Sequence, residues 1–109
     1  MTSTEWETLL TQLLSRHWLD YMAYDEGGHW GVAECIKNGY RGVRNALRDL
    51  PISDDDAAIY REAITRLKTG KGHYVTFYQK EDTTGWGDAV FDDVAEQLQA
   101  RLNALPDQS

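Results

Sequence analysis

The chain has 109 residues, 41% hydrophobic and 27% charged, a composition that predicts one globular domain over residues 1–109 and excludes wholesale disorder. Its formal net charge of −7 argues against nucleic acid as the main partner, because nucleic-acid binding usually needs a positive surface. Cys35 is the only cysteine, and the sequence has neither a signal-peptide pattern nor an apolar run of about 20 residues. We therefore expect a cytoplasmic protein without a membrane-spanning segment.

The first predicted element is an amphipathic helix that ends at the glycine pair Gly27-Gly28. Apolar or aromatic side chains recur along one of its faces at spacings of three and four residues: Trp6, Leu9, Leu10, Leu13, Leu14, His17 and Tyr21. Thr4 and Glu7 have the spacing of a capping box, which predicts the start of the helix. The aromatic residues within 18–24 leave a short strand open as an alternative there.

A second helix is predicted over residues 29–50, ending at Pro51. One apolar stripe supports it: Val32, Ile36, Tyr40, Val43, Leu47 and Leu50. Gly39 and Gly42 each cost about 1 kcal/mol inside a helix. They therefore indicate either a break at Asn38-Gly39 or a point where another backbone approaches closely.

Ser53 is a favourable N-cap for a third helix, which is predicted to end at Gly70. Strand-forming residues follow over His73–Gln79 and predict one short strand. A single strand cannot satisfy its own backbone hydrogen bonds, so it needs a partner. One candidate partner is the same strand of a second copy, which would make a homodimer.

A last helix is predicted over residues 88–105, with residues 106–109 as a frayed tail. Its buried face would carry apolar residues at helical spacing: Phe91, Val94, Leu98, Leu102 and Leu105. The predicted fold class is mainly α (α+β), with about four helices and one short strand or small β element.

Four basic residues share one face of the predicted second helix, at spacings of four, three and four: Lys37, Arg41, Arg44 and Arg48. Like charges at these spacings repel, so the row needs an anionic complement. This basic stripe can be matched by an acidic helix of the same domain, by an acidic protein, or by a phosphate-bearing ligand or nucleic acid. It is the alternative, anion-binding site.

The last predicted helix carries a row of carboxylates at every fourth position, Asp88, Asp92 and Glu96, with Asp93 beside them. Such neighbours lie about 5–6 Å apart and can imitate the phosphates of a nucleic-acid strand. The same row is also compatible with an ordinary solvated helix face, since acids in the first turn are favourable there.

Trp86 precedes this row and is flanked by glycines within the segment Thr83–Asp88. A tryptophan with a polar surround is suited to anchor an interface, unless it folds back into the core. The predicted partner-binding residues are therefore Trp86, Asp88, Asp92, Asp93 and Glu96.

The histidines give weaker signals for chemistry. His17 lies on the apolar face of the first helix, which favours a hydrogen-bonded core residue. A metal-dependent enzyme would have to draw its site from His17, Asp20, Asp25, Glu26 and His29. No phosphate-binding loop is present, and no catalytic, metal or cofactor site is predicted.

These patterns favour a small acidic, non-enzymatic protein that binds a partner with a basic surface and inhibits it. In general character the chain resembles the acidic inhibitors and immunity proteins of bacteria and phages, including mimics of DNA. The alternative is a nucleic-acid or phosphate-ligand binding protein that uses the basic stripe, and a small metal-dependent enzyme is the third hypothesis.

Overall fold

A computed structural model describes residues 1–73 and 85–106 of the chain. These residues form four helices, α1 (Ser3–Glu26), α2 (Trp30–Ala46), α3 (Asp56–Gly70) and α4 (Trp86–Ala104). The mainly helical class and the number of helices are confirmed. The described residues contain no strand; of the predicted strand His73–Gln79, only His73 is described, and it is not extended.

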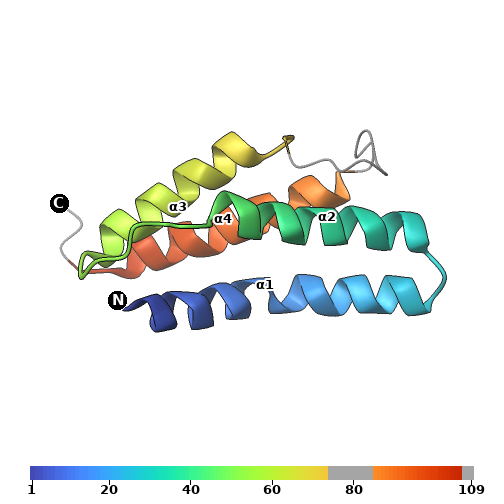
Figure 1. The fold of residues 1–109 in the computed structure, drawn as a ribbon, viewed down its shortest axis with the longest axis horizontal. Coiled ribbons are helices and arrows are strands. Elements are labelled where there is room, and N and C mark those ends of the chain that lie inside the picture. The colour runs from blue at the N-terminus through green and yellow to red at the C-terminus, as the bar shows by residue number, and fades with distance from the viewer. Residues whose placement is uncertain (74–84, 107–109) are drawn as a thin grey trace.

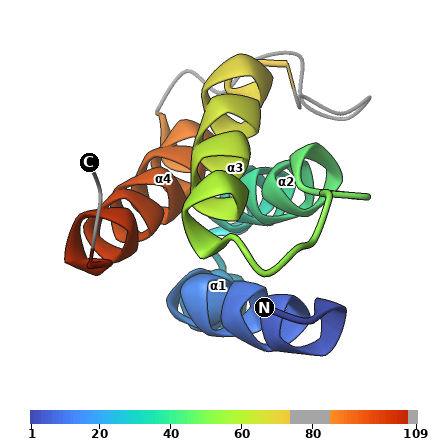
Figure 2. The same cartoon turned by 90° about the vertical axis from the view of Figure 1, so that its left-hand side faces the viewer.

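The first two helices form an antiparallel hairpin, and α4 packs against both of them (Figures 1 and 2). α3 covers the other side of α4 and also contacts α2. α2 and α4 are therefore the central pair, with α1 and α3 on opposite sides. None of the helices in the described ranges is long and apolar enough to cross a bilayer.

The core lies where the four helices meet and draws on each of them. Its most deeply buried side chains are Leu14, Val43, Ile59, Leu67, Val90, Phe91, Val94 and Leu98. Most of the predicted apolar stripes point into it, because the spacing of three and four residues places them on one face.

α2 and α4 cross in close contact at a pair of glycines. A Cβ atom added to Gly39 would lie 2.5 Å from the carbonyl oxygen of Gly87 and 2.8 Å from its Cα. α2 runs through this point without interruption, so the close-approach interpretation of Gly39 is confirmed and the break at Asn38-Gly39 is wrong. The missing side chains let two backbones approach, which offsets the helical cost of glycine.

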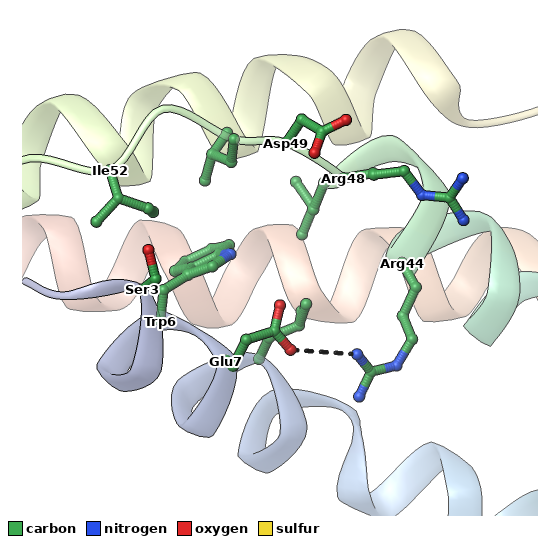
Figure 3. A pocket seen from close by; sticks show the side chains of 10 residues that line it. Ser3, Trp6, Glu7, Arg44, Arg48, Asp49 and Ile52 are labelled. Atoms are coloured by element: carbon green, nitrogen blue, oxygen red, sulfur yellow. Dashed lines mark ion pairs between the residues drawn. The ribbon is translucent and has the colours of Figure 1, made fainter.

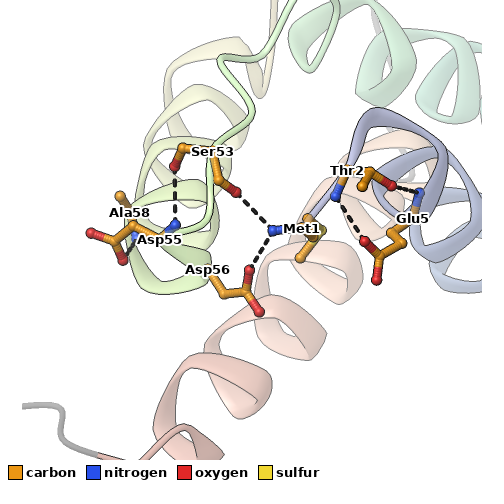
Figure 4. A network of polar contacts seen from close by, with 7 residues as sticks. All are labelled: Met1, Thr2, Glu5, Ser53, Asp55, Asp56 and Ala58. Carbon is orange, nitrogen blue, oxygen red and sulfur yellow. Dashed lines mark hydrogen bonds and ion pairs between the residues drawn. The ribbon is translucent and has the colours of Figure 1, made fainter.

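The N-terminus of α1 is capped two residues earlier than predicted. Thr2 Oγ1 accepts a hydrogen bond from the Glu5 backbone N–H at 3.1 Å, and Glu5 Oε1 accepts one from the Thr2 N–H at 2.9 Å (Figure 4). The predicted Thr4–Glu7 box is therefore wrong. The hydrogen bond from the Thr2 backbone lowers the pKa of the Glu5 carboxyl.

The start of α1 is also tied to the start of α3. The Met1 amino group donates to the Ser53 carbonyl at 2.7 Å and pairs with Asp56 Oδ1 at 3.0 Å (Figure 4). Asp55, and not Ser53, is the N-cap of α3, because its carboxylate accepts from the Ala58 N–H at 3.1 Å. Ser53 instead accepts from the Asp55 N–H through its hydroxyl oxygen at 3.1 Å.

α1 continues as a helix to Glu26, so the alternative strand within residues 18–24 is wrong.

α2 ends at Ala46, earlier than predicted, and Asp49 beyond it takes a left-handed conformation with φ 57°. Arg66 of α3 holds this turn by donating to the Arg48 carbonyl at 2.9 Å. α4 begins at Trp86, two residues before the predicted start.

Candidate binding surfaces

The acidic row of α4 is partly engaged by basic residues of the same chain. Asp92 Oδ1 lies 2.8 Å from the Lys71 Nζ, and both side chains are exposed. The hydrogen bond with Asp92 is the main reason that the pKa of Lys71 is raised, and Asp88 adds to the effect through its charge. Glu96 remains at the surface.

Asp93 points into the molecule and not toward a partner. Its Oδ2 lies 2.6 Å from Nε2 of the buried His17 and accepts a second hydrogen bond from Gln97 Nε2 at 2.8 Å. The same Gln97 nitrogen reaches the Leu13 carbonyl at 3.2 Å. His17 is thus the hydrogen-bonded core histidine that the sequence favours, and Asp93 joins α4 to α1.

Trp86 is neither the fully exposed anchor nor the fully buried core residue that the sequence allowed. Its ring is half-buried, packs against the core, and meets the Tyr24 ring edge-on with centroids 5.4 Å apart. Of the segment that was predicted to present it, residues 83 and 84 lie outside the described ranges. Trp86 fastens the start of α4 to the end of α1 and leaves only part of its surface for a partner.

Two residues of the basic stripe of α2, Arg44 and Lys37, contact side chains of α1. Arg44 lies 3.7 Å from Glu7 Oε2 and stacks over the Tyr40 ring at 5.3 Å. Lys37 lies over the Tyr21 ring at 5.6 Å. Arg41 is exposed, and within residues 1–73 and 85–106 no carboxylate pairs with it, with Lys37 or with Arg48. Among the described residues, the carboxylate that pairs with the stripe is Glu7 of α1.

The structure reveals a surface that the sequence reasoning did not single out, at the closed end of the α1–α2 hairpin. Four large apolar side chains are exposed there: Trp18 by 42%, Leu19 by 64%, Met22 by 41% and Trp30 by 71%. Acidic residues of the same stretch are also exposed: Asp20, Asp25 and Glu26. We call these seven residues the hairpin tip.

A change in the outward stripe of α1 marks where the tip begins. Along the first half of the helix, this stripe consists of exposed hydroxyl residues at spacings of four and three: Thr4, Thr8, Thr11 and Ser15. The same spacing continues with Trp18 and Met22. The signal was present in the sequence, as large apolar residues outside the core stripe of the helix.

The tip also contains part of an aromatic cluster that crosses between the two helices. Trp18 lies 5.1 Å from Tyr21 of α1 and 5.3 Å from Tyr40 of α2, both measured between ring centroids. Trp18 is therefore packed against both helices and still has 42% of its surface exposed. A fixed, partly exposed tryptophan loses little conformational entropy when a partner covers it.

The proposed metal ligands are not brought together. His17 pairs with Asp93, and His29 packs against the Tyr24 ring at 6.0 Å. Throughout the part of the chain that the structure describes, no group of three or more histidine, cysteine, aspartate or glutamate side chains is arranged to hold a metal ion. Cys35 is buried, with 6% of its surface exposed.

Comparison with known proteins assigns no family to this chain. No family model, no curated protein and no solved structure matches it. The function must therefore be argued from the surfaces described above.

Proposed function

We propose that this protein is a non-enzymatic binding protein that docks onto the basic surface of a larger macromolecule through the hairpin tip. The observation that carries the proposal is the exposure of Trp18, Leu19, Met22 and Trp30 at one end of an otherwise well-packed bundle. Large exposed apolar patches on soluble domains mark interaction sites, and tryptophan is enriched among the residues that dominate binding energy.

Charge indicates the chemistry of the partner. Asp20, Asp25 and Glu26 are exposed on the same stretch of α1, and none of the ion pairs between described residues involves them. An apolar centre with acidic neighbours fits a basic surface, and the net charge of −7 would speed encounter with it. Occupying that surface would inhibit the partner, in the manner of an immunity protein or a DNA mimic.

The α4 row contributes less to this proposal than the sequence suggested. Asp92 is paired with Lys71 and Asp93 with His17, so a partner would compete with existing contacts. Trp86 is half-buried against Tyr24. Glu96 keeps an exposed carboxylate and is suited to long-range attraction.

A capture experiment with matched variants tests the tip. The protein is immobilised and exposed to a lysate of the cells that contain it, alongside Leu19→Ala/Trp30→Ala and the control Thr65→Ala/Thr69→Ala on the exposed face of α3. We expect a partner that wild type and control retain and that the tip variant loses. Retention of every captured protein by the tip variant would contradict the proposal.

Salt and charge variants then test whether the partner surface is basic. Binding should weaken as salt rises, because exposed charges are screened within about 8–10 Å at ordinary ionic strength. Asp20→Asn/Asp25→Asn/Glu26→Asn should slow association and flatten the salt dependence. An unchanged association rate in this variant would remove the electrostatic part of the proposal.

The basic stripe supports a second candidate function, binding of a nucleic acid or phosphate-bearing ligand. Its supporting observation is that Arg41 and Lys37 have no carboxylate partner among the described residues. A gel-shift titration of wild type against Arg41→Glu/Arg44→Glu tests it. Equal binding of nucleic acid by both proteins, or by neither, would eliminate this function.

A further inference from the structure

A pocket lies at the end of the α1–α2 hairpin opposite the tip, where the start of α1, the end of α2 and the α2–α3 connection meet (Figure 3). Its cavity volume is about 410 Å³, within the range of small-molecule sites. The apolar part of its lining consists of Trp6, Leu10, Leu47, Leu50 and Ile52. An apolar molecule, or the apolar part of one, can be removed from water here.

Arg44 and Arg48 lie on the side of the pocket that the end of α2 forms. Arg44 Nη1 lies 3.7 Å from Glu7 Oε2, longer than the 2.7–2.9 Å of a direct charge-assisted hydrogen bond. Its Nε donates to the Tyr40 hydroxyl at 3.3 Å and its Nη2 to the Thr11 hydroxyl at 3.4 Å, which leaves the remaining N–H groups of the guanidinium without a hydrogen-bond acceptor among the described residues. The Arg48 guanidinium donates to the neutral amide oxygen of Asn45 at 3.1 Å and, in the described ranges, pairs with no carboxylate. Both guanidinium groups therefore keep donors that an incoming anion can accept from.

The acids at the rim limit where an anion can sit. Glu7 lies on the α1 side, facing Arg44, and Asp49 lies on the α2–α3 connection (Figure 3). An anionic group is repelled by both carboxylates and attracted to the arginine side. Guanidinium groups bind carboxylate and phosphate with planar, two-pronged geometry, which suits this position.

From these contacts we infer that the pocket binds a small amphiphilic anion, a molecule with an apolar body and one carboxylate or phosphate group. The apolar body lies over Trp6 and Ile52, and the anionic group accepts hydrogen bonds from Arg48 and Arg44. This site is separate from the hairpin tip and does not depend on the function proposed for it.

Trp6 provides a local reporter, because it lines the pocket and is only 4% exposed. Its indole N–H signal in a ¹H–¹⁵N spectrum, assigned with Trp6→Phe, is followed during titrations with four probes. Octanoate and octyl phosphate carry both parts of the proposed ligand, octanamide lacks the charge, and acetate lacks the apolar chain. We expect octanoate, octyl phosphate or both to bind saturably and at least about tenfold more tightly than octanamide or acetate.

Paired variants separate the pocket from general electrostatic attraction. Arg44→Gln/Arg48→Gln should weaken binding of the charged probe by at least about tenfold and leave octanamide unaffected. The control Arg41→Gln/Arg61→Gln removes the same charge at exposed positions outside the pocket and should change little. A carboxylate-selective or phosphate-selective response identifies which of the two groups the site prefers.

Three results would each overturn the inference: no saturable shift of the Trp6 signal with either charged probe, equal affinity for octanoate, octyl phosphate and octanamide, or equal weakening by both arginine variants. Should the double arginine variant not fold, Ser3→Tyr adds a bulky side chain to the lining of the pocket, with Thr65→Tyr on α3 as its control. Undiminished binding to Ser3→Tyr would overturn it as well. Neither pocket variant should alter capture through the hairpin tip.

Discussion

The two halves of α1 differ in what they place on the side of the helix that faces away from the core. The first half presents small hydroxyl residues there: Thr4, Thr8, Thr11 and Ser15. The second half presents Trp18 and Met22 at the same spacing, with Leu19 beside them. The inward stripe runs through both halves, buried from Trp6 to His17 and half-buried at Tyr21 and Tyr24.

The difference separates core packing from exposed apolar surface within one helix. Burial of Leu14 at 0% exposure contributes to the core, whereas Leu19 at 64% exposure contributes little to folding and adds apolar surface to the hairpin tip. Exposed apolar side chains of this kind, which add little to the core, are the observation on which the proposed contact with a partner rests.

The sharpest test compares the same substitution on the two sides of α1. Leu14→Ala should lower the free energy of unfolding by about 3–4 kcal/mol, because it leaves a cavity in the core at a fully buried position. Leu19→Ala should change it by less than about 0.5 kcal/mol. Urea unfolding followed by far-UV circular dichroism measures both. Equal losses would show that Leu19 is a core residue and would remove it from the tip.

Two glycines of α2 provide the next comparison. Gly39→Ala should cost about 2–3 kcal/mol, since its new methyl group would meet the Gly87 backbone at 2.5 Å. Gly31→Ala adds a methyl group where no atom lies within 4 Å, and should stabilise the helix by about 0.5–1 kcal/mol. Urea unfolding measures the free energy of unfolding of both variants. A decrease for Gly39→Ala with an increase for Gly31→Ala would confirm the tight crossing, and a decrease for both would contradict it.

Much of the fold could be predicted, because a helix with one buried face repeats apolar residues every three or four positions in the sequence. The apolar stripes predicted four helices, and Gly39 with Gly42 indicated either a break in the second helix or a close approach of another backbone. The caps could not be predicted as securely, because Thr2 and Glu5 have the same spacing as Thr4 and Glu7. The contact of Met1 with the start of α3 accompanies the earlier box, and that contact depends on tertiary packing.

The candidate surfaces were harder to predict, because a charge pattern does not say which charges the fold itself will use. Asp93 and Asp92 look alike in the sequence, yet only Asp93 faces His17 at the α1–α4 crossing. Three of the apolar tip residues, Trp18, Leu19 and Met22, were visible in the sequence as large side chains within 18–24. Their aromatic character suggested a strand, and only the continuous helix showed that they share its outward face.

The capping box at the start of α1 allows a smaller comparison. Thr2→Ala should cost about 1 kcal/mol, because it removes the oxygen that accepts from the Glu5 N–H. Thr4→Ala, two residues later and exposed, should change stability by less than about 0.5 kcal/mol. Chemical denaturation of the two variants decides between the boxes. The reverse order of effects would show that Thr4 is the N-cap in solution.

The smallest expected effect is a pH dependence at the ion pair between Lys71 and Asp92. Hydrogen bonding to Asp92 raises the pKa of Lys71 above its ordinary value of 10.5. The stability from this pair is therefore fully present below pH 10.5 and is lost as the pH rises through the higher folded-state pKa. Lys71→Met should flatten this alkaline loss, whereas Lys68→Met, one turn earlier and without an ion pair among the described residues, should retain it. Denaturation midpoints from pH 8 to about 12 measure the difference, and identical curves would show that Asp92 is free to meet a partner.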